Sequence, residues 1–362
     1  MPPLDLVDLR RYAVARSLFR PTTLPRAIAK LGFVQADPIR APARAQDLTL
    51  RHRVEGYRAG DLERRYGRLR LEEDVFVNYG FLSREHHALM HPRAARREWT
   101  PARRRQAEAV LKFVRERESV HPREVDAHFE HGKVTNWFGG SSNASTQLLD
   151  DMHYRGLLRV VRREGGVRVY GPREPHGPPP DQVQSQARMD ALVDILVKKY
   201  APLQGPMLNR LVTMLRAAAP QWTGDRKDAQ ARARKRHNHV RVDGADWYWP
   251  AGESPLSARH EESRGVRLLA PFDPVVWDRM RFEAFWGWAY RFEAYTPASK
   301  RKLGYYALPL LWDDQVIGWG NVRVVDGRLD VQLGYVKAAP RSAAFRSGLE
   351  EEIERLGAFL GL

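Results

Sequence analysis

The stretch LLRVVRREGGVRVYGP, residues 157–172, has the pattern of a β-hairpin. Apolar residues and arginines alternate on either side of Gly165–Gly166, a glycine pair that suits a tight turn between antiparallel strands. Three segments before it carry apolar residues at helical spacing: Ala107, Val110, Leu111 and Val114; then Val125 and Phe129; then Leu148, Leu149 and Met152. Three helices followed by a basic hairpin is the order of a winged helix, a helix-turn-helix variant, which we expect over residues 101–175.

Local signals also predict the ends of these helices. Pro122 suits the first turn of the second helix. Ser142 or Asn143 is the expected cap of the third helix, and Gly156 is its expected C-terminal stop.

The same plan recurs on both sides of this segment. After the Pro/Gly-rich linker 172–181, residues 182–260 contain two apolar helical patterns, a basic run and a hairpin with an Asp243–Gly244 turn. Residues 1–100 also contain two helical patterns, the second capped by Thr23 and ended by Gly32. We therefore predict an α+β protein with three tandem winged helices, 1–100, 101–175 and 182–260.

The pattern changes from about residue 265. Short apolar stretches are broken at Asp313–Asp314 and Asp326–Gly327, which predicts a small β-sheet or barrel. A last amphipathic segment, roughly 341–360, predicts a terminal helix. Residues 265–362 are thus expected to form a β-rich C-terminal domain.

Charge is the strongest signal of a partner. The chain of 362 residues has a net charge of +16, and fifty of its 60 basic residues are arginines. A GC-rich genome accounts for much of the Arg:Lys ratio but less easily for the net charge, so we expect a nucleic-acid partner. The expected phosphate contacts in the second and third winged helices are Arg155, Arg162, Arg163, Arg168, Arg234 and Arg236.

Several kinds of chemistry lack support in this sequence. The chain has no cysteine, P-loop, G-x-G-x-x-G or G-x-S-x-G motif, and no apolar run of membrane-spanning length. His87 and His91 have metal-ligand spacing, but no carboxylate or cysteine nearby completes a set, so we expect no metal site. We expect a monomeric cytoplasmic protein.

Gln35 and Asp37, in FVQADP (33–38), admit two interpretations. A strand over 33–37 places both side chains on one face, where an amide and a carboxylate suit a hydrolytic site. Alternatively, Asp37 before Pro38 is a helix N-cap followed by a first-turn proline, which the local sequence favours. In PFDPVVWDR (271–279), an Asp-Pro turn and a buried salt bridge account for the two aspartates.

Taken together, these segments resemble the AlkZ/YcaQ-type bacterial DNA glycosylases over nearly the whole chain. The resemblance is carried by LAPFDPVVWDR (269–279), YRFEAYTPASKRKLGYYALPLL (290–311) and VQAD followed by PARAQDLTLRHR. It implies three winged helices with a C-terminal β-rich domain, and a catalytic Gln-x-Asp signature of the YcaQ-like branch at Gln35–Asp37. Arg44 and Arg53 match arginines of the family, which implies that they contact the DNA backbone. Arg40 and Arg51 lie close to them in sequence and are also expected to contact DNA.

The resemblance implies a monofunctional glycosylase that removes N-alkylated purines from double-stranded DNA and leaves an abasic site. Asp37 would position water or stabilise an oxocarbenium ion, and Gln35 would position the water or the damaged nucleotide. No cofactor is expected, and the distance in sequence to the closest lysine, Lys30, argues against a Schiff-base step. The competing hypothesis is a non-catalytic winged-helix protein, a transcriptional regulator or a chromatin component.

Overall fold

The computed structural model describes residues 3–95, 97–130, 132–135, 141–260 and 264–362. The chain divides into two compact units. The first unit consists of Met1–Asp61, Val193–Val212 and Gln230–Leu362, and the second of Leu62–Leu192 and Thr213–Ala229. None of the helices in the described residues is long and apolar enough to cross a bilayer.

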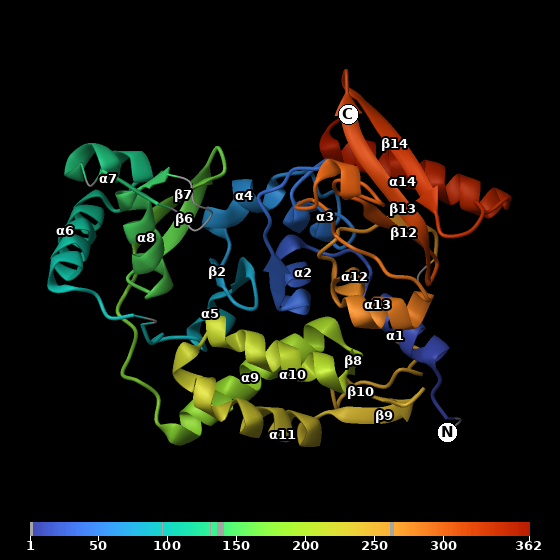
Figure 1. Cartoon of the computed structure of the whole chain (residues 1–362), viewed down its shortest axis with the longest axis horizontal. Helices are drawn as coiled ribbons and strands as arrows, with labels where there is room; N and C mark the ends of the chain where they lie inside the picture. Colours follow the sequence, from blue (N-terminus) through green and yellow to red (C-terminus); the bar gives the residue numbers. More distant parts are fainter. Residues whose placement is uncertain (1–2, 96, 131, 136–140, 261–263) are drawn as a thin grey trace. The chain divides into compact units, whose positions relative to one another are not determined.

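The second unit contains the predicted β-hairpin of residues 157–172 and the three helices predicted before it. It has helices α6 (Pro101–Arg117), α7 (Pro122–Phe129) and α8 (Ala144–Tyr154), with the short strands β4 (Lys133–Thr135) and β5 (Ser141–Asn143) between them. Strands β6 (Leu158–Glu164) and β7 (Val167–Pro172) then form an antiparallel hairpin, as Figure 1 shows. The predicted glycine turn is confirmed, because Gly165 and Gly166 have φ angles of 56° and 89°.

Two helix ends in this unit test the predicted stops and caps. Gly156 has a φ of 77° directly after the C-cap residue of α8, as predicted for a glycine stop. Asn143 lies at the N-cap position of α8, but its side chain donates to the Asp126 carboxylate and caps no backbone N–H of the helix. The position of the cap was therefore predicted, whereas its hydrogen bond was not.

The remaining elements of the second unit precede α6, lie within Thr213–Ala229, or belong to helices that the two units share. They are α4 (Asp61–Arg65), η1 (Tyr66–Arg68), β2 (Leu71–Val75), β3 (Tyr79–Ser83), α5 (Arg84–Ala88), η2 (Leu215–Ala217) and η3 (Pro220–Asp225), with parts of α9 (Gln182–Tyr200), α10 (Gly205–Met214) and α11 (Arg226–Arg236). Strands β2 and β3 pair as an antiparallel hairpin.

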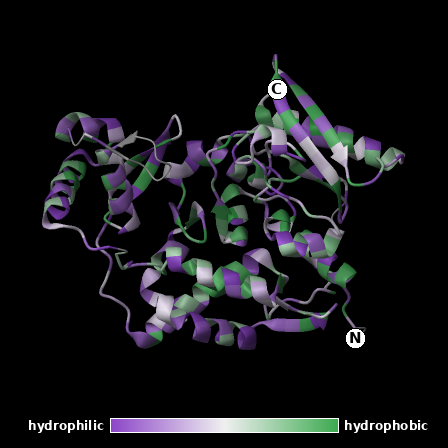
Figure 2. Cartoon of the chain, viewed as in Figure 1, coloured by the Kyte–Doolittle hydropathy of each residue, from purple (hydrophilic) through white to green (hydrophobic). Residues whose placement is uncertain are grey.

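The first unit holds the hairpin predicted at Asp243–Gly244. Strand β10 (Ala245–Trp249) pairs with β8 (Leu203–Gln204) on one edge and with β9 (Asn238–Val242) on the other. Asp243 and Gly244 both have positive φ angles between β9 and β10, which confirms the predicted turn. The basic run before this hairpin is the helix α11, drawn largely in the hydrophilic colour in Figure 2.

The first unit also holds the N-terminal elements α1 (Leu6–Ser17), α2 (Leu24–Leu31), β1 (Phe33–Gln35) and α3 (Ala45–Leu50). Thr23 is the N-cap residue of α2 and Gly32 its C-cap, with a φ of 69°, as predicted. Helix α1 packs on helices α12 (Pro274–Trp277) and α13 (Arg279–Trp286), and its Val14 and Leu18 join a buried core with Phe282 and Leu311.

The C-terminal part of the first unit is a four-stranded antiparallel sheet in the order β11 (Val266–Leu268), β12 (Leu308–Trp312), β13 (Gln315–Val325), β14 (Arg328–Tyr335). The short helix η4 (Ala298–Lys300) precedes β12, and α14 (Ala343–Leu360) packs on β11 and β14 (Figure 1). Both predicted turns are present, with Asp313, Asp326 and Gly327 at positive φ. Hydrophobic and hydrophilic residues alternate along these strands in Figure 2, as one buried face requires.

The compact units do not follow the predicted domain boundaries. Residues 1–100 and 182–260 each contribute segments to both units. The boundaries were placed at linkers along the chain, whereas compact units reflect which segments pack together in space. The α+β class and the β-rich C-terminal part agree with the structure; the count of three winged helices stays a prediction.

Candidate active site

Gln35 is held by a tryptophan that is distant in sequence. It is the last residue of β1, half-buried, and follows the buried Phe33 and Val34. Nε1 of Trp277, at the end of α12, donates to Oε1 of Gln35 over 3.0 Å. The ring of Tyr200 packs on the Trp277 ring with centroids 4.6 Å apart. The acceptor end of the Gln35 amide is thus fixed, and Nε2 is the end that donates.

Asp37 does not cap a helix. Strand β1 ends at Gln35, so the predicted strand over 33–37 is too long, and the next helix, α3, begins only at Ala45 with Arg44 as its N-cap residue. Oδ1 of Asp37 accepts a 2.9 Å hydrogen bond from the backbone N–H of Ile39, which closes a local turn. The N-cap interpretation is therefore wrong. The carboxylate instead closes a local turn in the segment between β1 and α3.

Asp37 lies in a partly desolvated environment with tyrosines nearby. Burial raises the pKa of its carboxyl group, and the hydrogen bond from Ile39 partly opposes this. After burial, the charge of Asp37 is the next cause that raises the pKa values of Tyr295 and Tyr306, so the carboxylate lies within electrostatic range of both rings. Asp37 thus has the desolvated setting that strengthens charge–charge interactions at a reaction centre.

The two tyrosines within electrostatic range of Asp37 belong to an aromatic cluster. The Phe292 ring contacts the rings of Tyr306 and Tyr295 at centroid distances of 5.2 and 6.0 Å. Tyr306 is buried, whereas Tyr295 exposes 77% of its surface. A tyrosine so exposed beside a partly desolvated carboxylate offers a flat face to a ligand.

Two arginines predicted to contact DNA are structural instead. Arg53 is fully buried and forms a bidentate ion pair with Asp273, at 2.7 and 2.9 Å. The Arg51 side chain is 3% exposed, and it binds Glu352 and the carbonyl oxygen of Leu268. Because both guanidinium groups are enclosed and paired with carboxylates, the predicted DNA contacts of Arg51 and Arg53 are corrected. The buried salt bridge predicted for PFDPVVWDR is confirmed at Asp273.

The other predicted arginines differ in exposure. Arg163 is mostly buried and paired with the fully buried Glu73, so it too is structural. Arg40, Arg162 and Arg234 are exposed. The remaining four are partly exposed. Three of them form ion pairs within the protein: Arg155 with Asp151, Arg168 with Asp150, and Arg236 with Asp194. The fourth, Arg44, is half-buried at the start of α3. A DNA-contact role for these seven arginines stays a prediction.

A model of the AlkZ-like DNA glycosylase family matches residues 28–359, which is most of the chain and includes Gln35, Asp37, Trp277 and Tyr295. The chain belongs to the AlkZ-like DNA glycosylase family. It is accordingly a DNA glycosylase, an enzyme whose partner is DNA.

The fold of this AlkZ-like chain agrees with a solved structure. DNA glycosylase AlkZ from Streptomyces sahachiroi superposes with a TM-score of 0.64, covering 99% of this chain and 98% of that one, at 15% sequence identity. At that identity the similarity concerns the fold. It does not assign roles to individual residues of the AlkZ-like chain.

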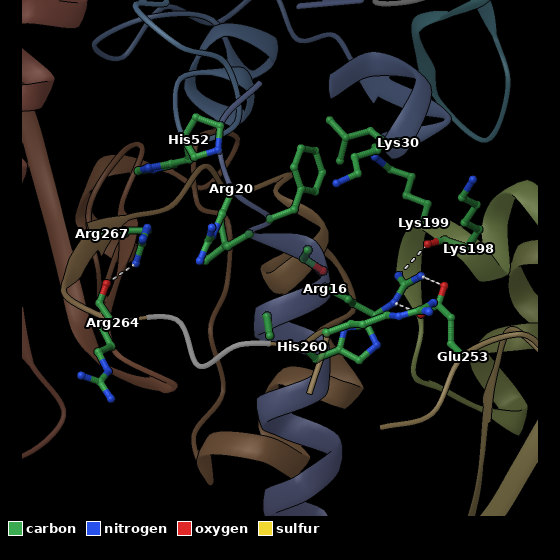
Figure 3. A pocket seen from close by; sticks show the side chains of 17 residues that line it. Arg16, Arg20, Lys30, His52, Lys198, Lys199, Glu253, His260, Arg264 and Arg267 are labelled. Atoms are coloured by element: carbon green, nitrogen blue, oxygen red, sulfur yellow. Dashed lines mark hydrogen bonds and ion pairs between the residues drawn. The ribbon is translucent and has the colours of Figure 1, made fainter. Parts of the chain in front are cut away.

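Sequence reasoning missed a basic pocket in the first unit of the AlkZ-like chain. This cavity of about 680 Å³ is lined by cations from separate segments, with a single carboxylate among them, Glu253 (Figure 3). Burial, then the charge of Arg53, lowers the pKa of Lys199 in its wall to about 7. The basic residues of the lining are Arg16, Arg20, Lys30, Lys198, Lys199, Arg259, Arg264 and Arg267, together with the histidines His52 and His260. No local motif signals this pocket, because its residues are dispersed between positions 16 and 267.

The structure also supplies the carboxylate that the histidine pair lacked in sequence. Asp74 on β2 lies beside His87 and His91, and the three side chains are close enough to share a metal ion. The expectation that no carboxylate completes this set is therefore wrong. Asp74 was missed because it precedes the histidines by more than a helical turn and reaches them only through the fold.

Proposed function

We propose that this glycosylase hydrolyses the N-glycosidic bond of N-alkylated purines in double-stranded DNA and leaves an abasic site. The substrates are adducts of the N7-alkylguanine type, including bulky and crosslinked ones. The observation that carries the proposal is the partly desolvated Asp37 carboxylate beside Gln35, with the exposed Tyr295 nearby. Gln35–Ala36–Asp37 also matches the Gln-x-Asp signature of the YcaQ-like branch.

Asp37 supplies the negative charge that this reaction needs. An N7-alkylated guanine is already cationic, so its glycosidic bond breaks without a strong acid, and the positive charge passes to the sugar as an oxocarbenium ion. A carboxylate in a partly desolvated site stabilises that ion more strongly than one in water. Its raised pKa also makes it a better base toward the attacking water.

Gln35 orients the reactants. Because Trp277 holds its oxygen, the amide has one defined orientation, with Nε2 as its donor end. A donor two residues from the carboxylate in sequence suits the sugar oxygens or the water. The buried Tyr200 ring, tilted by 31° against the half-buried Trp277 ring, supports this arrangement.

The proposed substrate range follows from the exposure of the aromatic wall. Tyr295 exposes most of its ring at the surface of the first unit, where a base carrying a bulky substituent has room to stack. An enzyme that encloses an extruded base in a tight pocket excludes such adducts. We therefore expect tolerance of large alkyl groups.

The basic pocket is the proposed contact for the DNA backbone in the first unit. Its exposed lysines, Lys30 and Lys198, are able to reach a phosphate group, and the surrounding arginines add to the positive potential (Figure 3). The exposed Arg40 and Arg234 are further candidates in the same unit.

The monofunctional assignment needs a test, because the fold brings a lysine to β1. Nζ of Lys199 donates to the carbonyl oxygen of Phe33, two residues before Gln35. The sequence-based argument that no lysine is near is therefore insufficient. We retain a hydrolytic reaction without a Schiff base, because Lys199 is buried and its amine is engaged with the backbone. Borohydride in the reaction is expected to trap no protein–DNA adduct; an adduct lost in Lys199→Met would show a lyase step.

The central experiment compares base release by the native chain and by Asp37→Asn. The substrates are duplexes containing N7-methylguanine, a nitrogen-mustard monoadduct or its crosslink. We expect Asp37→Asn to reduce release at least about 100-fold, because it removes the charge but keeps the shape. DNA binding, measured in parallel, is expected to stay unchanged.

The matched control is Asp243→Asn, which replaces an exposed aspartate in the β9–β10 turn. Asparagine tolerates the positive φ of that position, so this variant keeps full activity if the charge of Asp37 is specifically required. Equal release by Asp37→Asn and the native chain would remove Asp37 from the chemistry. No release by the native chain from any of the three substrates would refute the proposed substrate class.

A further inference from the structure

A buried cluster of histidines with one aspartate lies in the second unit, which contains neither Gln35 nor Asp37. Asp74 belongs to β2, His87 belongs to α5, and His91 lies three residues beyond the end of α5. All three are at most 2% exposed. Two histidines close in sequence and a carboxylate from a strand offer the nitrogen and oxygen ligands of a transition-metal site.

The distances within the cluster are those of a coordination shell. One oxygen of Asp74, Oδ2, lies 2.9 Å from Nε2 of His87 and 3.5 Å from Nε2 of His91. The three ligand atoms lie within 4.8 Å of one another. Metal–nitrogen bonds of about 2.0–2.1 Å place neighbouring ligand atoms of a tetrahedral zinc site about 3.3 Å apart. A small movement of the side chains thus closes the set around one ion.

Unpaired imidazole nitrogens point to a missing ligand. Within the described part of the chain, neither ring nitrogen of His91 makes a hydrogen bond, and neither does Nε2 of His176. The His91 ring stacks between those of His87 and His176, at centroid distances of 4.4 and 4.3 Å. Buried polar atoms are nearly always paired, and an ion is one of the few groups that satisfies several neutral imidazoles at once.

Gly156 preserves the space around these nitrogens. A Cβ atom at this position would lie 2.8 Å from Nδ1 of His91 and 2.6 Å from Nε2 of His176. Any larger residue would therefore displace the two rings. The positive φ of Gly156 already favours glycine as a helix stop, and this close approach is a second, independent requirement for it.

The surroundings of Asp74 suit a metal ligand. Its other oxygen, Oδ1, accepts a 3.1 Å hydrogen bond from Arg93, whose guanidinium is fixed by the carbonyl oxygens of Tyr154 and Ala218. Arg93 thus orients the carboxylate and leaves Oδ2 facing the imidazoles, as outer partners of metal ligands commonly do. A cavity of about 380 Å³, lined by His87 and His176 among others, provides access for an ion.

We propose that Asp74, His87 and His91 bind one divalent transition-metal ion, of the class that zinc represents. Two imidazoles and one carboxylate match the ligand preference of this class, whereas calcium and magnesium select oxygen ligands. The ion fastens the segment after α5, which contains His91, to β2 within the second unit.

The test uses the tag-free full chain, treated with a chelator, dialysed, and titrated with Zn²⁺ and Co²⁺. We expect one ion per chain, bound at about 1 µM or tighter, and a rise in melting temperature on adding Zn²⁺. Bound Co²⁺ should show the visible absorption bands of a site with nitrogen and oxygen ligands. Failure to bind one equivalent of either metal would overturn the proposal.

Variants identify the ligands. His91→Asn and His87→Asn should each abolish the Co²⁺ bands in a chain whose circular-dichroism spectrum is unchanged. His239→Asn, at an exposed histidine of β9, is the matched control and should bind as the native chain does. Unchanged binding by a folded His91→Asn variant would refute the site.

Discussion

Tyr295 is the exposed residue on which the damaged base is proposed to stack. It packs on Phe292, exposes 77% of its surface and lies within electrostatic range of Asp37. Exposed aromatic rings of this kind contribute little to folding, but they contribute strongly to binding when a nucleobase stacks on them.

Tyr295→Ala is expected to reduce the efficiency of base release by about tenfold or more, because stacking on one base contributes about 1–3 kcal/mol. Its free energy of unfolding should change by no more than about 0.5 kcal/mol. Tyr295→Phe should retain activity, since the ring remains. Val183→Ala, at an equally exposed apolar residue, is the control. Unaltered kinetics in Tyr295→Ala would remove the ring from the substrate site.

Lys199 makes the stability of the protein depend on pH. Burial lowers its pKa from 10.5 to about 7, so between these values the folded chain binds fewer protons at this group than the unfolded chain does. The free energy of unfolding therefore rises with pH through this window, and the destabilising effect of Lys199 is complete below about pH 7. We expect Lys199→Met to stabilise the protein by about 2–4 kcal/mol at pH 6 and much less at pH 10.

Urea unfolding at both pH values measures this difference. Lys198→Met is the matched control, because Lys198 is adjacent in sequence but exposed, and its substitution should give no pH-dependent difference. An equal effect of Lys199→Met at pH 6 and pH 10 would contradict a lowered pKa.

At the scale of elements, the short helix α12 is held in place by an ion pair. Asp273 accepts a hydrogen bond from Val275 at the start of α12 and binds the buried Arg53, and the same helix ends at Trp277, the partner of Gln35. A four-residue helix is not stable by itself. Its position, and with it the orientation of Gln35, therefore depends on this pair.

Arg53→Met is expected to destabilise the protein by about 3–5 kcal/mol, because it leaves the buried Asp273 carboxylate without its ion-pair partner. Base release should decrease as well, through the altered position of Trp277. Arg323→Met serves as the control: it breaks the exposed pair with Asp330, which should cost about 1 kcal/mol or less. Similar losses in the two variants, measured by urea unfolding, would contradict this account.

Most elements were predictable from local sequence because local forces determine them. The turns at Gly165–Gly166 and Asp243–Gly244 require positive φ angles, and Gly32 and Gly156 end helices for the same reason. The length of β1 was overestimated, because alternation of side chains continues beyond the last residue that is in the strand.

At the scale of the whole molecule, the charge of +16 predicts DNA binding that weakens steeply with salt. Lys30→Ala combined with Lys198→Ala removes two exposed cations of the basic pocket. The slope of log K against log[salt], measured on undamaged duplex, should become shallower by about 2. Lys337→Ala combined with Lys227→Ala, at exposed lysines outside this pocket, is the control. An unchanged slope in the pocket variant would show that DNA does not contact the pocket.

The sequence by itself determined the α+β class, the hairpin turns, the helix ends, the basic character and the resemblance to a glycosylase family, because these depend on residue type and near neighbours. Only the tertiary structure decided which charges are buried. It enclosed Arg51 and Arg53, left Asp37 partly desolvated without a helix to cap, and brought Asp74 to a histidine pair. Burial and charge act through space between residues that are distant along the chain, so no local pattern encodes them.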